Sequence, residues 1–168
     1  MKKKKFGIIG NPVSHSLSPV MHNYWFKKYK INAEYELFDI AENEIQNVIN
    51  KIKDKNIKGI NVTLPYKKSI IPYLNKTIND ANETHSVNTL MLDEKDNLIG
   101  ENTDVFGFQA AYLKSLSGEE KRNKSVLILG AGGVAPSIIL ALIKSNIFDI
   151  SLTNRTYDKS LFLKKKFK

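Results

Sequence analysis

The sequence predicts an α/β fold made of two domains, and three observations support this prediction. Strand-like and helix-like patterns alternate along the 168 residues. A polar stretch over residues 117–124 interrupts the alternation. After it the pattern restarts with an apolar run, a glycine-rich turn and an apolar helix. We therefore expect an N-terminal α/β substrate domain over residues 1–102, a linking helix and loop over 103–122, and a partial second domain over 123–168.

Hydrophobic spacing defines the elements of the first domain. Apolar runs and alternating patterns predict strands at residues 6–9, 34–38, 59–62, 87–92 and 98–100. A polar turn at 93–97 joins the last two strands as a hairpin. Helical spacing predicts helices at 19–29, 41–52, 103–116 and near 68–74. Ser18 is the expected N-cap of the first helix, with Pro19 at its first position.

The second domain begins with a β-α-β pattern. Residues 125–129 are continuously apolar, as in a parallel strand buried on both faces. A helix at 134–145 and a strand at 149–153 follow, and residues 161–168 again have a helical pattern. The length of this unit, about 30 residues, is typical of one β-α-β crossover.

The turn between the first strand and helix of this unit fits the pattern G-x-G-x-x-[GA]. Its sequence is Gly130-Ala131-Gly132-Gly133-Val134-Ala135. The first glycine allows a tight turn, the second lets a pyrophosphate approach the backbone, and the small third residue lets helix and strand pack. The positive end of the helix then faces the phosphates. We predict a partial Rossmann domain that binds a dinucleotide at Gly130, Ala131, Gly132, Gly133 and Val134.

The end of the second strand favours NADP over NAD. NAD-binding domains place an acidic residue there to hold the ribose hydroxyls. This chain has Asn154-Arg155-Thr156 instead, with Lys159 one turn later. Arginine can hold a 2′-phosphate bidentately, and threonine can donate a hydrogen bond to it. The same residues also suit a helix cap, and both interpretations can hold together.

Composition argues against several other functions. The chain has no cysteine, so disulfides, thiolate catalysis and cysteine-based zinc sites are excluded, and the three histidines form no metal-binding motif. The net charge of +9 comes from scattered lysines without a recognition motif, so nucleic-acid binding is not expected. No apolar run is long enough to cross a membrane, and no signal peptide is apparent. We expect a cytoplasmic protein that acts on a small molecule.

Polar side chains gather at strand ends of the first domain. In the stretch 61–67, Pro65 ends an apolar strand and leaves an amide, a hydroxyl and an amine at its end, where open α/β sheets bind ligands. Ser14 and Ser16 precede a helix N-terminus, which suits a carboxylate. Residues 87–89 and 100–104 add further amides and a carboxylate. Each cluster alone could be a simple cap or turn.

Together the motifs strongly resemble the shikimate dehydrogenase family. They are Asn-Pro-Val-x-His-Ser-x-Ser-Pro-x-x-His-Asn (11–23), Asn-Val-Thr-x-Pro-x-Lys (61–67), Val-Asn-Thr (87–89), Gly-x-Asn-Thr-Asp-x-x-Gly (100–107), the glycine turn and Asn-Arg-Thr (154–156). The resemblance implies reversible, NADP-dependent reduction of 3-dehydroshikimate to shikimate, a step in chorismate and aromatic amino acid biosynthesis. It also allows a homodimer.

The resemblance assigns roles to individual residues. Lys67 and Asp104 would be the catalytic pair, and Asp104 would also accept a substrate hydroxyl. Ser14, Ser16 and Thr63 would hold the substrate carboxylate and nearby groups, and Asn61 and Asn88 would bind ring hydroxyls. The chemistry is consistent with this, because a cationic donor such as Lys67 stabilises charge on the carbonyl oxygen as hydride arrives and supplies the proton.

Two departures from the family pattern stand out. The family usually has Ile-Gly-Ala before Val-Asn-Thr, whereas this chain has Thr84-His85-Ser86. Family members also continue through further strands of the dinucleotide domain, so we interpret this chain as C-terminally truncated relative to the family. The alternative interpretations are a quinate/shikimate dehydrogenase and an inactive substrate-binding remnant.

Overall fold

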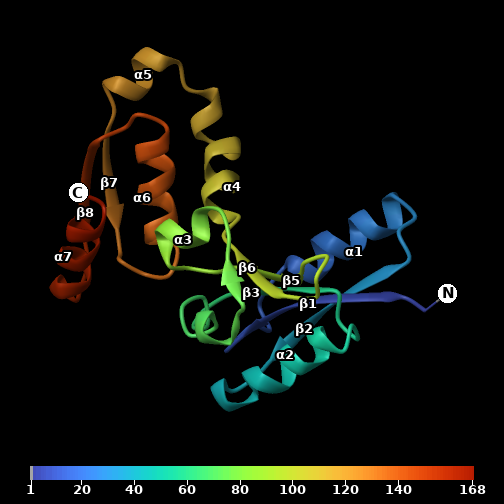
Figure 1. The fold of residues 1–168 in the computed structure, drawn as a ribbon. Helices are drawn as coiled ribbons and strands as arrows, with labels where there is room; N and C mark the ends of the chain where they lie inside the picture. Colours follow the sequence, from blue (N-terminus) through green and yellow to red (C-terminus); the bar gives the residue numbers. More distant parts are fainter. Residues whose placement is uncertain (1) are drawn as a thin grey trace. The chain divides into compact units, whose positions relative to one another are not determined.

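A computed structural model describes residues 2–168, which divide into two compact units (Figure 1). Unit 1 contains the chain up to Ile78 together with Val87–Glu101, and unit 2 contains Asn79–Ser86 and Asn102–Lys168. The α/β class predicted from the sequence is confirmed. Residues 79–86 lie within the expected first domain by sequence, but their contacts place them in unit 2.

Unit 1 is built on one mixed sheet of order β2-β1-β3-β5-β6-β4. The strands are β1 (Lys4–Gly10), β2 (Ala33–Asp39), β3 (Gly59–Val62), β4 (Lys76–Thr77), β5 (Thr89–Leu92) and β6 (Leu98–Glu101). Strand β1 pairs in parallel with both β2 and β3, and the expected hairpin of β5 and β6 pairs antiparallel. Because β1 and β3 are adjacent and parallel, the loops that follow them leave the sheet at the same edge.

Two helices cover unit 1, with α1 (Ser18–Lys28) and α2 (Ile45–Lys53) on opposite sides of the sheet (Figure 1). Helix α2 buries Ile45, Val48, Ile49 and Ile52, the spacing of one helical face. The expected helix at 41–52 starts instead with a 3₁₀ helix, Glu42–Glu44. Near 68–74 only a 3₁₀ helix, Ile71–Tyr73, forms, since Pro72 has no amide N–H for a longer helix.

Unit 2 contains the parallel β-α-β unit predicted from the glycine turn. Its elements are α3 (Asp80–Thr84), α4 (Asp104–Ala111), a 3₁₀ helix (Leu113–Ser115), α5 (Gly118–Arg122), β7 (Ser125–Leu129), α6 (Ala135–Lys144), β8 (Asp149–Thr153) and α7 (Tyr157–Lys166). The expected helix at 103–116 therefore ends early. Within residues 2–168 no helix exceeds 11 residues, whereas a membrane-spanning helix needs about 20.

Helix α5 was not predicted, because its segment is polar and has no apolar face. It begins with a capping box at Ser117. The Ser117 hydroxyl accepts the amide N–H of Glu120 at 3.2 Å, and the Glu120 carboxylate accepts the Ser117 N–H at 2.8 Å. These two reciprocal bonds satisfy orphan donors of the first turn, so the short helix forms without hydrophobic burial.

The core of unit 2 lies on one side of β7 and β8. Val105 of α4 packs there with Leu140 and Leu142 of α6, and Leu163 of α7 packs with Ile139. The expectation that β7 is buried on both faces is wrong. Leu127 and Leu129 are 64% and 77% exposed, because α6 and α7 pack against the opposite face, which carries Ile128.

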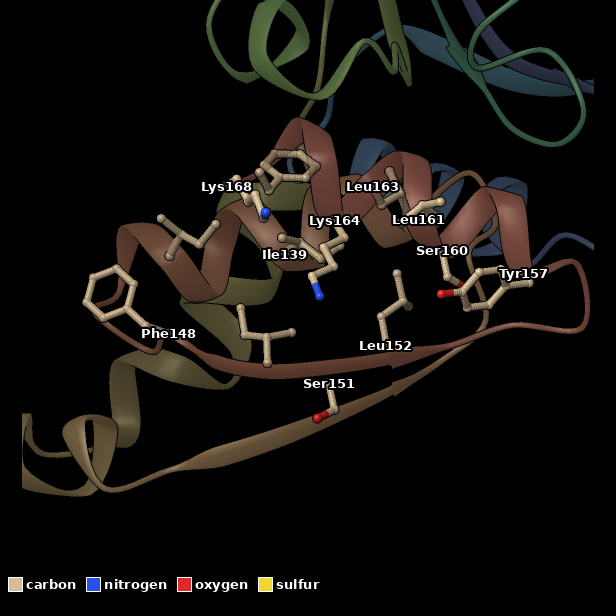
Figure 2. A pocket seen from close by; sticks show the side chains of 13 residues that line it. Ile139, Phe148, Ser151, Leu152, Tyr157, Ser160, Leu161, Leu163, Lys164 and Lys168 are labelled. Carbon is tan, nitrogen blue, oxygen red and sulfur yellow. The ribbon is translucent and has the colours of Figure 1, made fainter.

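A cavity of about 700 Å³ lies between α6, β8 and α7 (Figure 2). Its lining is largely apolar and includes Ile139, Leu152 and Tyr157. The Ser160 hydroxyl is buried beside it with no hydrogen-bond partner among the described residues. None of the residues predicted to bind substrate or cofactor lines this cavity, so it is not part of the candidate site.

Candidate functional site

The loops that follow β1 and β3 touch each other at the sheet edge. The amide N–H of Thr63 donates to the carbonyl of Ile9 at 2.9 Å, and that of Asn11 donates to the carbonyl of Leu64 at 3.1 Å. Gly10 makes this approach possible, since a Cβ there would lie 2.6 Å from Thr63 Cγ2 and 3.0 Å from the Leu64 carbonyl oxygen. The loop after β1 carries Ser14 and Ser16 and is called the serine loop below. It therefore starts beside the turn after β3 that carries Lys67.

In the serine loop, Ser14 is exposed and Ser16 is partly buried. Ser18 is the first residue of α1, so the prediction that it is the N-cap is wrong. The Ser16 hydroxyl instead accepts the N–H of Ser18 at 3.3 Å and lies 3.1 Å from the Ser18 hydroxyl. Ser16 thus satisfies a backbone donor of the first turn and is held at the positive end of α1.

Asn61 and Asn88 lie together in one hydrogen-bonded cluster. Asn61 Nδ2 donates to the backbone carbonyl of Asn88 at 3.2 Å and to Thr89 Oγ1 at 3.1 Å. The Thr89 hydroxyl donates to Asn88 Oδ1 at 3.0 Å, and Asn61 Oδ1 accepts from the Tyr35 hydroxyl at 2.6 Å. Both amide protons of Asn61 are engaged, so its side chain can serve a ligand only as an acceptor.

Tyr35 and Thr89 belong to this cluster but were not among the predicted site residues. The Tyr35 ring stacks on His22 with centroids 4.2 Å apart, and the Asn23 side chain bonds both backbone groups of Tyr35 at 3.0 Å. Burial raises the pKa of Tyr35 to about 12, so its hydroxyl stays protonated and remains a donor at neutral pH. The sequence did carry a signal for Tyr35, because it is a tyrosine at an inward position of an alternating strand. A buried tyrosine hydroxyl needs a hydrogen-bond partner, which could have indicated a polar cluster there.

Lys67 is partly buried and lies in a turn that is fixed on both sides. The N–H of Val87 donates to the Lys67 carbonyl at 2.8 Å. The preceding Tyr66 is 3% exposed, and its hydroxyl donates to the carbonyl of Ile40 at 2.6 Å. These contacts hold the backbone that carries the predicted proton donor. Lys67 belongs to unit 1 and Asp104 to unit 2, and their pairing stays a prediction.

The glycine turn of unit 2 has the backbone that its sequence requires. Gly130 has φ +110°, a conformation that strains other residues, and its N–H donates to the carbonyl of Thr153 at 2.7 Å. A Cβ on Gly132 would meet no protein atom within 4 Å, so the backbone there is open to a ligand. At the start of α6 the Ala135 N–H donates to the Gly132 carbonyl at 3.2 Å and Pro136 has no N–H. An anion there would therefore be met by backbone N–H groups of the turn itself, such as that of Val134, and by the positive end of the helix.

The loop after β8 is joined to the glycine turn by Asn154. Asn154 Oδ1 accepts the N–H of Ala131 at 3.0 Å, while its Nδ2 donates to the Thr156 carbonyl at 2.7 Å. Asn154 therefore acts mainly as a link between the two loops. Arg155, Thr156 and Lys159 are exposed, so their side chains are accessible to a phosphate. These residues and the open turn fit the adenosine phosphates of a dinucleotide.

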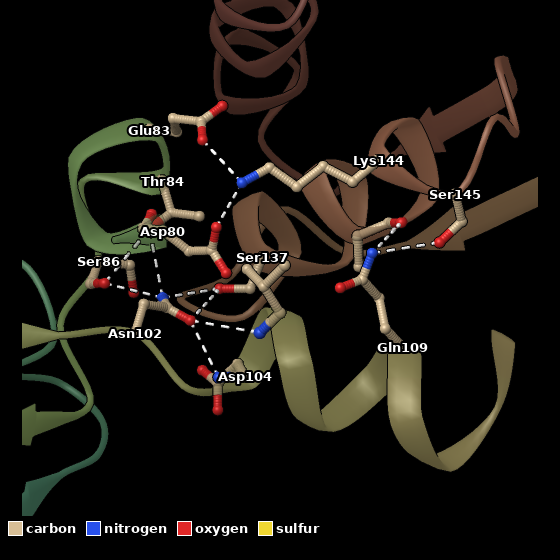
Figure 3. Close-up of polar contacts among 12 residues, drawn as sticks. Asp80, Glu83, Thr84, Ser86, Asn102, Asp104, Gln109, Ser137, Lys144 and Ser145 are labelled. Carbon is tan, nitrogen blue, oxygen red and sulfur yellow. Dashed lines mark hydrogen bonds and ion pairs between the residues drawn. The ribbon is translucent and has the colours of Figure 1, made fainter. Parts of the chain in front are cut away.

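A buried polar network in unit 2 lies beside these elements (Figure 3). The side chain of Asn102, 2% exposed, donates to the Ser86 carbonyl at 2.8 Å and to the Ser137 hydroxyl at 2.9 Å. Its Oδ1 accepts the N–H of Asp104 at 3.0 Å, which caps the start of α4. The Ser86 hydroxyl donates to the carbonyl of Gly133 in the glycine turn at 3.2 Å. Asn102 belongs to the Gly-x-Asn-Thr-Asp motif, but that motif gave no indication of its bonds to Ser86 and Ser137.

Helix α3 is held on α6 by an ion-pair cluster. Lys144 Nζ pairs with Asp80 and with Glu83, the latter at 2.8 Å (Figure 3). The hydrogen bond to Asp80, followed by that to Glu83, raises the pKa of Lys144 above its usual value. Because the Lys144 side chain is 38% exposed, these ion pairs contribute little to stability, and they mark where the segment 79–86 packs against α6.

Unit 2 contains a parallel β-α-β unit with a glycine turn, and unit 1 carries polar side chains at its strand ends. Together they define a two-domain α/β protein of the Rossmann type. Two family models match the sequence: "Shikimate dehydrogenase substrate binding domain" over residues 8–90 and "Shikimate / quinate 5-dehydrogenase" over residues 113–168. The chain belongs to the shikimate dehydrogenase family.

Individual relatives agree with this assignment. The NADP(+) shikimate dehydrogenase of Pelagibacter ubique is 49% identical over 166 residues, which cover 98% of this chain and 61% of the relative. The crystal structure of shikimate dehydrogenase from Aquifex aeolicus is 41% identical with a TM-score of 0.88, over 98% of this chain and 60% of that one. The Thermus thermophilus enzyme in complex with NADP(H) and shikimate is 29% identical with a TM-score of 0.85, at the same two coverages. The chain spans about three fifths of the length of these relatives.

Proposed function

We propose that this chain supplies the substrate domain and part of the dinucleotide domain of an NADP-dependent shikimate dehydrogenase, which reversibly reduces 3-dehydroshikimate to shikimate. The observation that carries the proposal is the cluster of Asn61, Asn88 and Thr89 at the end of β3, in the same loop region as Lys67. Such a cluster offers fixed donors and acceptors to the hydroxyls of a polar ring. The names of the relatives support the same substrate and cofactor.

In the proposed reaction, bound NADPH supplies hydride to the substrate carbonyl. Ser14, Ser16 and Thr63 hold the substrate carboxylate and nearby groups, and the positive end of α1 supports the negative charge. Asn61 accepts a hydrogen bond from one ring hydroxyl, and Asn88 binds another. Lys67 Nζ donates a proton to the carbonyl oxygen as negative charge develops there. Asp104 orients Lys67 and accepts a substrate hydroxyl.

The direct test is shikimate-dependent formation of NADPH by the purified chain, followed by absorbance. Quinate is assayed in parallel, because the second family model covers both substrates. Turnover of shikimate supports the proposal, and faster turnover of quinate would favour the quinate/shikimate alternative. Shikimate binding in calorimetry without turnover would identify a substrate-binding remnant, while the absence of both would refute the proposal.

Arg155 is proposed to select NADP over NAD. It is exposed in the loop that Asn154 ties to the glycine turn, where a 2′-phosphate would lie. Replacing Arg155 with glutamine should weaken NADP binding about ten-fold, the usual scale for one charged hydrogen bond, and leave NAD binding unchanged. Calorimetric titration with each nucleotide measures both effects.

Arg122 provides the matched control, because it is the only other arginine in the sequence. It lies in α5, so Arg122→Gln changes the net charge equally without altering the loop after β8. Equal losses of NADP affinity in both variants would show a general charge effect. An unaltered chain that binds NAD as tightly as NADP would contradict the proposed cofactor preference.

Tyr35 is proposed to orient Asn61 for the substrate. Tyr35→Phe keeps the ring that stacks on His22 and removes only the hydroxyl that Asn61 Oδ1 accepts. Losing one such bond should weaken shikimate binding about five-fold, with NADP binding unchanged. Calorimetry with shikimate measures this, and Tyr112→Phe on the surface of unit 2 is the control. Unchanged shikimate affinity in Tyr35→Phe would remove Tyr35 from the site.

The homodimer and the cytoplasmic location belong to this proposal as well. The homodimer stays a prediction, and light scattering after size-exclusion chromatography measures it. A monomeric mass at micromolar concentration would contradict it. Fractionation of the source cells tests the cytoplasmic location.

A further inference from the structure

We infer that Ser86 is a positioning residue for the glycine turn, and that Asn102 links it to the start of α4. The inference deepens the proposed function, because it takes the glycine turn as the site of the dinucleotide pyrophosphate. It concerns contacts within unit 2 alone. Ser86 lies outside the family motifs described above, and Asn102 is the asparagine of Gly-x-Asn-Thr-Asp, to which those motifs assigned no role.

The first step of the argument is the bond from Ser86 to the turn. The Ser86 side chain is fully buried, and its single proton is donated to the carbonyl of Gly133. That carbonyl and the N–H of Val134 belong to one planar trans peptide unit, so they point in opposite directions. By fixing the carbonyl, Ser86 also fixes the direction of the Val134 N–H. This N–H is one of the donors at the start of α6 that a pyrophosphate would use.

The second step is the way Ser86 is itself held. Its backbone carbonyl accepts from Asn102 Nδ2 at 2.8 Å, so the serine is bonded on its side chain and on its backbone. Asn102 also bonds Ser137 of α6 and the N–H of Asp104 (Figure 3). One buried amide therefore connects the segment 84–86, helix α6 and the first turn of α4. A fully satisfied buried network of this kind holds its members rigidly.

The third step is that these bonds depend on residues that depart from the family pattern given in the sequence analysis. Thr84-His85-Ser86 stands where the family usually has Ile-Gly-Ala. Alanine has no hydroxyl, so it could not form the bond to Gly133. Isoleucine could not accept the bond that the Thr84 hydroxyl receives from Asn102 at 3.2 Å. His85 takes a left-handed conformation, φ +48° and ψ +46°, which persists in non-glycine residues where the surroundings fix it.

The test compares Ser86→Ala with Ser145→Ala. Ser145 also links α4 to α6, because its hydroxyl accepts a hydrogen bond from Gln109 Nε2 at 3.2 Å. It lies at the C-terminal end of α6, far from the glycine turn. We expect Ser86→Ala to weaken NADP binding about five-fold and to leave shikimate binding within two-fold, because one buried hydrogen bond near the cofactor is lost. In the ligand-free chain, amide exchange at residues 130–135 should become faster. Ser145→Ala should change neither quantity.

Each outcome decides the inference. Unchanged NADP affinity and unchanged exchange in Ser86→Ala would overturn it, as would equal responses in the two variants. If Ser86→Ala does not fold, Ser86→Cys replaces it, because the thiol has a similar shape and is a weaker donor. If the unaltered chain does not bind NADP, the proposed function fails for this chain. The exchange comparison then decides whether Ser86 positions the turn.

Discussion

Replacing Lys67 with alanine is expected to abolish NADPH formation from shikimate while leaving NADP affinity unchanged. The turn that carries Lys67 is fixed by the Val87–Lys67 backbone bond and by Tyr66, so the loss of its amine should not move the loop. A positioned proton donor contributes about 10²- to 10⁴-fold to such a reaction. Turnover assays and NADP calorimetry on the same preparation separate the two effects.

The neighbouring lysine supplies the control for this experiment. Lys68 is exposed and follows Lys67 directly, so Lys68→Ala removes an equal charge one residue away. We expect its turnover to stay within about two-fold of the unaltered chain, as for most surface substitutions. Near-normal turnover in Lys67→Ala would refute the assignment of Lys67 as the proton donor.

Substituting Gly132 with alanine is expected to weaken NADP binding about 100-fold without lowering the melting temperature. The added methyl group meets no protein atom within 4 Å, so the fold itself tolerates it. It would occupy the space through which a pyrophosphate approaches the backbone. Loss of that approach would also remove hydrogen bonds at the start of α6. Calorimetry with NADP and a thermal melt of the free chain measure the two quantities.

Two further glycines make this prediction specific. Gly130→Ala should lower stability as well, since φ +110° strains any residue with a Cβ. Gly118→Ala, at the start of α5, introduces only an ordinary contact of 3.6 Å with Arg122 and should leave both quantities unchanged. If Gly132→Ala binds NADP normally, the glycine turn is not the pyrophosphate site.

Much of the fold could be predicted because its signals are local. The apolar run before the glycine turn and the helix after it predicted the β-α-β unit of β7, α6 and β8. The spacing of Ile45, Val48, Ile49 and Ile52 predicted the buried face of α2. Pro65 correctly indicated that the strand stops before it, and β3 ends at Val62. In each case the side-chain period or a backbone restriction acts within a few residues.

Other features depend on partners that are distant in the sequence. Helix α3 is too short to show a periodic pattern, and it packs against α6, where Lys144 pairs with Asp80 and Glu83. The exposure of Leu127 and Leu129 depends on which face of β7 the helices cover. Apolar composition alone could not distinguish one covered face from two, since the strand is apolar on both.

The sequence by itself determined which chemical groups this chain carries at its strand ends and turns: an amine at Lys67, amides at Asn61 and Asn88, and an open backbone at Gly132. Those assignments follow from residue type and local backbone preference. Only the tertiary structure decided how the groups are oriented. Tyr35 and Thr89 fix the Asn61 amide, and Ser86 fixes the Gly133 carbonyl. The physical reason is that a hydrogen bond orients a group through a partner, and the 26 to 47 residues between these partners leave no local pattern.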